Sequence, residues 1–190
     1  MNLIPWVVSG GMVGLSVFVW GQGLAWQFGE LSGYQLFPLF GLLAFTVMWA
    51  HYAVYFLQQI FKFGEDRWYL PITRYIVLFS LLMHPGLLIW MRWRDGFPPS
   101  TIFGLGGWVL VGIASWFIFM IFESHRWYRD QAWWRWITWA NGVAMILIIF
   151  HALNLGSDLQ IGWFRWVWYF FGVSLVVFLI KEYYDSRRGR

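Results

Sequence analysis

The chain contains no cysteine and few charged residues. Asp, Glu, Lys and Arg make up 12% of its 190 residues, compared with about 25% in an average soluble domain. Without cysteine, the chain alone cannot form disulfides, iron–sulfur clusters, thiolate zinc sites or cysteine nucleophiles. Any metal or redox chemistry must therefore use its 4 histidines.

Several functional motifs are also missing. The sequence has no Gly-rich dinucleotide fingerprint or phosphate loop in a polar context, no pair of carboxylates within an apolar run, and no nucleophile beside a base. The net charge of +4 is too small and too scattered for a nucleic-acid-binding surface. No room is left after Ile180 for a flavin domain, so we expect that this chain alone cannot oxidise a nicotinamide.

Hydrophobic residues account for 60% of the chain, and they fall into six long runs. A bilayer core about 30 Å thick requires about 20 apolar residues in a helix. Because only short loops separate the runs, we predict an all-α integral membrane protein with a six-transmembrane-helix bundle as its single domain, residues 1–190. The predicted spans cover residues 6–26, 36–61, 72–91, 101–122, 132–155 and 163–180.

The basic residues predict the orientation of the bundle. Cytoplasmic loops carry the excess of Lys and Arg in multi-pass proteins of the cell membrane. If both termini are cytoplasmic, only three of the 13 Lys and Arg residues lie outside, namely Arg92, Arg94 and Arg165. We therefore predict a cell-membrane protein with both termini in the cytoplasm.

Two histidines within the predicted spans share one depth. His84 lies eight residues before Arg92, and His151 lies seven before Asp158, which places them about 12 Å and 10 Å from the outer boundary. Their spans also run in the same direction. Two imidazoles at one level on neighbouring helices are what a bis-histidine haem b requires. The alternative is that each histidine is a polar group hydrogen-bonded to a carbonyl or a neighbouring helix.

The other two histidines fit this arrangement less well. His51 lies eleven residues before Lys62, about 16 Å from the inner boundary. There it either contacts the edge or a propionate of the haem, or a quinone, or forms an interhelical hydrogen bond. His125 follows the fourth span, where an interfacial position is expected.

Several segments resemble the ferric reductase-like transmembrane domain family, over residues 36–184. The third span contains Met83-His84-Pro85, and the fifth contains Phe150-His151-Ala152. Further similarity lies in Ser124-His125-Arg126 and Trp134-Arg135-Trp136. The resemblance implies a six-helix membrane domain that binds haem b, with His84 and His151 as axial ligands of the haem iron.

The sequence also departs from the pattern of this family. Its members commonly carry a second haem, with further histidines thirteen or fourteen residues upstream of these ligands. The corresponding positions here are Leu70 or Pro71 and Ile137 or Thr138. The resemblance therefore implies a single haem on the outer side.

These features lead to two hypotheses about function. The first is a haem b electron carrier, the membrane subunit of a ferric reductase-like oxidoreductase, which passes electrons from a quinol or a separate flavoprotein to an external acceptor. The second is a haem-free accessory or scaffold subunit of a larger membrane complex. Both imply contact with lipid, and both allow an oligomer.

Overall fold

The structure is a computed structural model that describes residues 2–29, 31–64, 66–124, 130–160 and 162–188, with side chains up to Asp185. These residues form helices and no strand. In chain order the elements are α1 (Ile4–Gly23), α2 (Gly33–Phe61), α3 (Tyr69–Arg94), the 3-10 helix η1 (Pro99–Gly104), α4 (Gly107–Glu123), α6 (Trp134–Leu155), the 3-10 helix η2 (Ser157–Gln160) and α7 (Gly162–Arg188).

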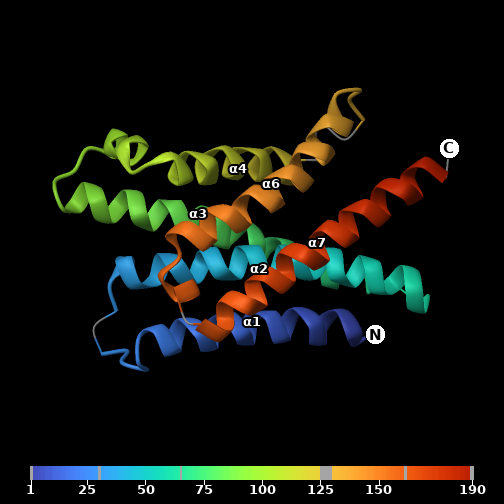
Figure 1. Ribbon diagram of the computed structural model, residues 1–190, viewed down its shortest axis with the longest axis horizontal. Helices are drawn as coiled ribbons and strands as arrows, with labels where there is room; N and C mark the ends of the chain where they lie inside the picture. Colours follow the sequence, from blue (N-terminus) through green and yellow to red (C-terminus); the bar gives the residue numbers. More distant parts are fainter. Residues whose placement is uncertain (1, 30, 65, 125–129, 161, 189–190) are drawn as a thin grey trace.

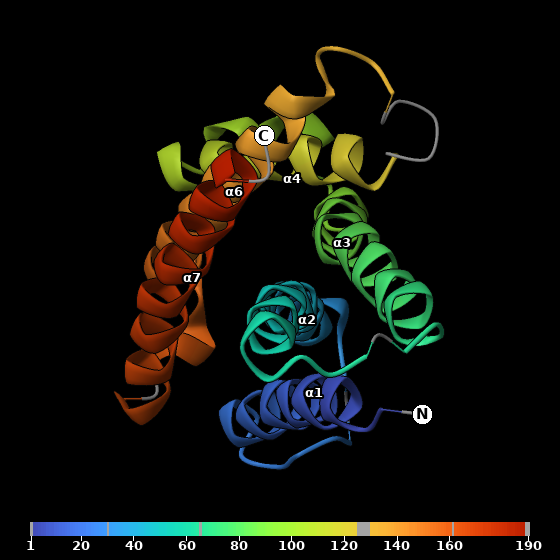
Figure 2. The ribbon, with the colours of Figure 1, turned by 90° about the vertical axis from the view of Figure 1, so that its right-hand side faces the viewer.

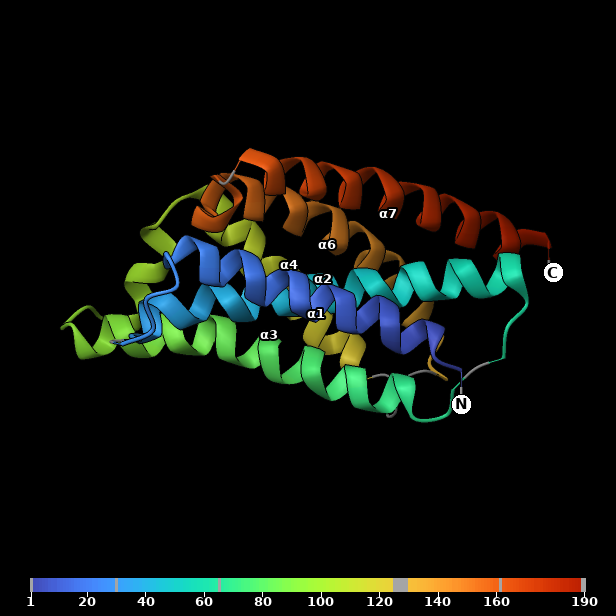
Figure 3. The same ribbon diagram turned by 90° about the horizontal axis from the view of Figure 1, so that it is seen from below.

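The α-helices are arranged as two antiparallel hairpins with one further helix on each side. Helices α2 and α3 pack closely along their length, and so do α4 and α6 (Figure 1). Helix α1 covers α2, while α7 lies against both α2 and α6 (Figures 2 and 3). The start of α1 and the end of α7 lie at the same end of the molecule. The two hairpins contact each other mainly through single side chains, which are described below.

The helices bear out the predicted membrane location. Five of them, α1, α2, α3, α6 and α7, are long and apolar enough to cross a membrane. Helix α4 has only 17 residues, about 26 Å of helix at the usual rise. Large apolar side chains such as Val7, Tyr75 and Trp166 are 70%, 70% and 74% exposed. Such surfaces are suited to contact with lipid.

Two predicted spans extend three or more residues beyond the end of the helix in the structure. The fourth begins at Gly107 instead of residue 101, because Pro99 starts a 3-10 helix and Gly106, with φ 114°, takes a conformation that favours glycine. The first ends at Gly23 rather than Trp26, since Ala25 and Trp26 turn the chain with φ of 50° and 59°.

Aromatic side chains attach α7 to α2. The ring centroids of Phe45 and Trp168 are 4.5 Å apart, and those of Trp49 and Phe171 are 4.7 Å apart. All four side chains are buried, and the Trp49 indole also donates a hydrogen bond of 3.0 Å to the Ser174 hydroxyl. Because α7 also packs on α6, this cluster helps to hold the two hairpins together.

One buried carboxyl lies in the connection between α6 and α7. Asp158 in η2 is 8% exposed, and no hydrogen bond or ion pair of the described residues involves it. Its Oδ1 lies so close to Gly23 that a Cβ there would come within 2.5 Å of this oxygen. Desolvation raises the pKa of Asp158 to about 6.

This pKa predicts a pH-dependent stability. The folded state binds the proton more tightly than the unfolded state, so the free energy of unfolding should fall as pH rises from about 4 to about 6. A shift of about two pH units corresponds to about 3 kcal/mol. Asp158→Asn should remove this dependence and raise stability at pH 7 by up to that amount, measured by unfolding of the detergent-solubilised protein. A variant with the same pH dependence as the unmodified chain would contradict this assignment.

Candidate functional site

His84 and His151 make equivalent hydrogen bonds to the main chain of a neighbouring helix. His84 Nδ1 lies 2.7 Å from the carbonyl oxygen of Phe37 in α2, and His151 Nδ1 lies 2.7 Å from that of Trp108 in α4. A carbonyl only accepts, so Nδ1 carries the proton in both neutral rings. Each Nε2 then has a free lone pair, which is the tautomer that binds metals through Nε2.

A glycine lies beneath each of the two imidazoles. A Cβ at Gly41 would come within 2.9 Å of His84 Cε1, and one at Gly112 within 2.4 Å of His151 Cε1. Each glycine follows the hydrogen-bonded carbonyl residue by four positions, one helical turn. The absence of a side chain therefore lets each ring lie against the backbone of the partner helix.

A proline and a tryptophan connect the two hairpins close to this level. Pro85, directly after His84, has no N–H and so leaves the carbonyl of Leu81 in α3 without its usual helical donor. The Trp116 indole in α4 donates a hydrogen bond of 2.8 Å to that carbonyl. Trp116 lies one turn from Gly112, so this bond aligns the histidine of one hairpin with that of the other.

His84 belongs to α3 and His151 to α6, which are in different hairpins and run in the same direction (Figure 1). The two histidines of the predicted pair, 67 positions apart, thus make the same kind of contact with the neighbouring helix of their own hairpins. His51 lies elsewhere, ten residues along α2 from Gly41, or about 15 Å along the helix axis.

Two histidines are too few to hold a bare metal ion, but they are the number of axial ligands that a haem iron uses. Among the described residues, no three His, Cys, Asp or Glu side chains gather as a metal-ion site. A porphyrin supplies its own four nitrogens, so a haem iron needs only two axial ligands. Two neutral imidazoles with free Nε2 atoms and glycine-lined positions match that requirement.

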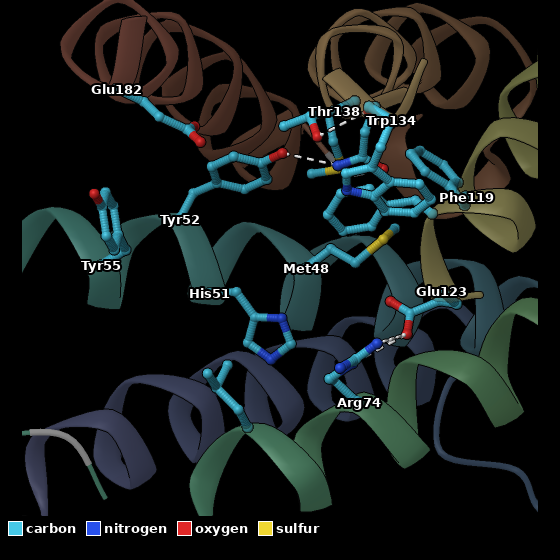
Figure 4. Close-up of a pocket in the computed structure, with 14 residues that line it drawn as sticks. Met48, His51, Tyr52, Tyr55, Arg74, Phe119, Glu123, Trp134, Thr138 and Glu182 are labelled. Carbon is cyan, nitrogen blue, oxygen red and sulfur yellow. Dashed lines mark hydrogen bonds and ion pairs between the residues drawn. The ribbon is translucent and has the colours of Figure 1, made fainter. Parts of the chain in front are cut away.

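A cavity of about 420 Å³ lies between α2, α3, α4, α6 and α7, toward the end of the molecule where α1 begins and α7 ends, and we call it the inner cavity after the predicted orientation (Figures 1 and 4). Leu70 and Thr138, two of the four positions considered above for a second pair of ligands, both line it. Most of its wall is apolar. The ionisable and hydroxyl- or amide-bearing side chains of the wall are those of His51, Tyr52, Tyr55, Arg74, Glu123, Thr138, Asn141 and Glu182.

Pairwise contacts satisfy most of these polar groups. Arg74 forms an ion pair of 2.9 Å with Glu123, which joins α3 to α4, and Asn141 Nδ2 donates to the Tyr52 hydroxyl at 2.9 Å. Nothing in the sequence indicates that Arg74 pairs with Glu123. The ion-pair partner could not be identified because it is 49 positions away.

His51 adopts the opposite tautomer to the other two histidines. Its Nε2 lies 2.7 Å from Thr73 Oγ1, whose hydroxyl donates to the carbonyl of Tyr69 at 2.8 Å. Since that proton is already used, His51 Nε2 must donate and Nδ1 keeps the lone pair. An interhelical hydrogen bond, one of the two expectations for His51, is therefore present.

His125 lies outside the described residues, so its expected interfacial position is not described. Sequence reasoning did not identify Gly41 and Gly112 as part of the site. The only signal was a glycine in an apolar run, which is equally typical of helix packing.

Comparisons of the chain with family models, curated proteins and solved structures give no match. The interpretation of the site therefore depends on its own geometry.

The glycine beneath His151 provides a test of this geometry. Gly112→Ala should displace the imidazole and weaken its bond to Trp108, lowering the free energy of unfolding by about 1–2 kcal/mol. Gly107→Ala in the same helix is the control, because a Cβ there meets nothing within 4 Å. Thermal unfolding in detergent measures both. Equal stability of the two variants would contradict the close contact between His151 and Gly112.

Proposed function

We propose that the chain is a membrane-embedded haem b electron-transfer protein, with His84 and His151 as axial ligands of one iron. The observation that carries the proposal is that each histidine donates a hydrogen bond from Nδ1 to a main-chain carbonyl, which leaves the Nε2 atom of both rings free. When bound, the haem would supply one-electron redox chemistry.

The residues around the imidazoles have defined roles in this proposal. The carbonyls of Phe37 and Trp108 orient the rings and increase the basicity of the nitrogen that faces the metal. Gly41 and Gly112 allow the rings to approach the helix backbone. The apolar surroundings and the restricted access of water would set the potential of the iron together with its ligands.

The wider proposal keeps the six-span arrangement with both termini cytoplasmic, and the haem in the outer half of the membrane. Electrons would come from a quinol or a separate flavoprotein and pass to an external acceptor, as in a ferric reductase-like system. This chain would be the membrane subunit of such an oxidoreductase. The resemblance of the segments around His84 and His151 to that family supports the proposal, as does the pairing of these two residues.

A haem-free accessory or scaffold subunit is the second candidate function. Its supporting observation is that each imidazole already satisfies one polar atom through an interhelical bond, as a purely structural histidine does. The two candidates differ in the use of Nε2. In the accessory subunit this nitrogen has no ligand to bind.

Haem content of single variants tests the proposed function. The protein, purified in detergent after expression with adequate haem, should show reduced-minus-oxidised absorption bands of haem b. His84→Ala and His151→Ala should each lose most of the haem. His51→Ala is the matched control, since its imidazole lies in the inner cavity, and it should retain haem at the level of the unmodified chain.

Three outcomes would overturn the proposal. The first is absence of haem b bands in the unmodified protein. The second is retention of haem by both His84→Ala and His151→Ala. The third is loss of haem in His51→Ala alone, which would assign ligation to the inner cavity.

A further inference from the structure

The inner cavity is lined by neither His84 nor His151. Met145, on its wall, lies six residues before His151 in α6, about 9 Å along the axis. On α3, Arg74 lies ten residues before His84, or about 15 Å. The cavity thus begins about two helical turns inward of the proposed haem ligands and extends toward the inner end of the bundle.

The shape and lining of the cavity suit a flat, mostly apolar ring. Its volume of about 420 Å³ lies within the usual range of about 300–1,000 Å³ for small-molecule sites. Aromatic side chains, including Tyr52, Phe119 and Trp134, form part of the wall (Figure 4). A ligand of this class would be held by apolar contacts and oriented by a few polar groups.

Two polar groups are available to orient such a ring. His51 Nδ1 keeps its lone pair and can accept from a hydroxyl. The Tyr52 hydroxyl accepts from Asn141, so its own proton can be donated to a carbonyl. Figure 4 shows the His51 and Tyr52 side chains directed to opposite sides of α2, so these groups meet the cavity at different places.

The charges in the cavity disfavour an anionic ligand. Arg74 is neutralised by Glu123. Glu182 also lines the cavity, and no ion pair or hydrogen bond of the described residues neutralises it. A phosphate or carboxylate in the cavity would be repelled by the Glu182 carboxylate, and Arg74 is already paired with Glu123. A neutral ring would not be repelled.

We propose that this cavity binds the head group of a membrane quinone or quinol. The ring would lie among the aromatic side chains. In the quinone a carbonyl would accept from the Tyr52 hydroxyl, and in the quinol a hydroxyl would donate to His51 Nδ1. The choice of a quinone over another neutral ring rests on the proposed electron-transfer function. The site itself rests on the cavity and its lining.

Photolabelling of the full chain in detergent tests the site. The probe is an azido-substituted benzoquinone with a decyl tail, and mass spectrometry of the digest locates its adducts. We expect adducts on the cavity-lining parts of α2 and α6, displaced by excess decylubiquinone but not by decanol. Tyr52→Phe keeps the ring but removes the hydroxyl that donates to a quinone carbonyl, and it should raise the concentration for half-maximal labelling about fivefold, the effect of one lost hydrogen bond.

A cavity-filling variant and its control complete the experiment. Thr138→Trp places a large side chain in the cavity and should abolish the displaceable adducts. Val143→Trp adds the same side chain to an exposed position of α6 that does not line the cavity, and it should label normally. If Thr138→Trp does not elute as a monodisperse species, the Tyr52→Phe result decides: labelling at the concentration of the unmodified chain would overturn the proposal.

Adducts that decanol displaces equally well, or that persist in Thr138→Trp, would overturn the proposal. The haem spectrum of the same samples separates this result from the proposed function. Displaceable cavity adducts in a protein without haem b bands would support the quinone site and refute the haem. Haem b bands in a protein without cavity adducts would support the haem and refute the quinone site.

Discussion

The hydrogen bond from a histidine Nδ1 to the carbonyl of a neighbouring helix is the interaction on which the proposed site depends. It occurs at His84 and again at His151, at the same length of 2.7 Å. The bond fixes the tautomer, holds the ring against a glycine one turn further along the partner helix, and joins the two helices of a hairpin. The same contact that stabilises each hairpin therefore leaves the Nε2 lone pair of its histidine free.

The alignment of the two hairpins depends on different contacts. Pro85 leaves the Leu81 carbonyl free, and Trp116 uses it to connect α4 with α3 next to the histidine level. Further inward, the Arg74–Glu123 ion pair makes a second connection between the same helices. Helix α7 packs across both hairpins. The two imidazoles thus lie at one level of the bundle, and the cavity lies between that level and the end where α1 begins and α7 ends.

The sequence was sufficient to predict the coarse architecture and the main candidate pair. Apolar runs of about 20 residues identify membrane helices because the thickness of the bilayer sets their length. Distances from charged residues gave the matching depths of His84 and His151. The late start of α4 was missed, since an apolar composition does not show that Gly106 interrupts the helix.

The partners of the site could not be predicted from the sequence. Phe37 and Trp108 contribute main-chain carbonyls. Every residue type has such a carbonyl, so the sequence does not mark these two, and each lies more than 40 positions from its histidine. The cavity arises from the packing of five helices, so no local pattern indicates its volume. The tautomer of His51 likewise depends on where the Thr73 hydroxyl directs its proton.

The coordination state of the iron tests the central claim most directly. Low-temperature electron paramagnetic resonance of the oxidised, haem-loaded protein distinguishes a six-coordinate iron with two imidazoles from one with a single imidazole. The account predicts one low-spin haem per chain, with a signal typical of bis-histidine ligation. A high-spin signal, or a protein that takes up no haem at all, would contradict it.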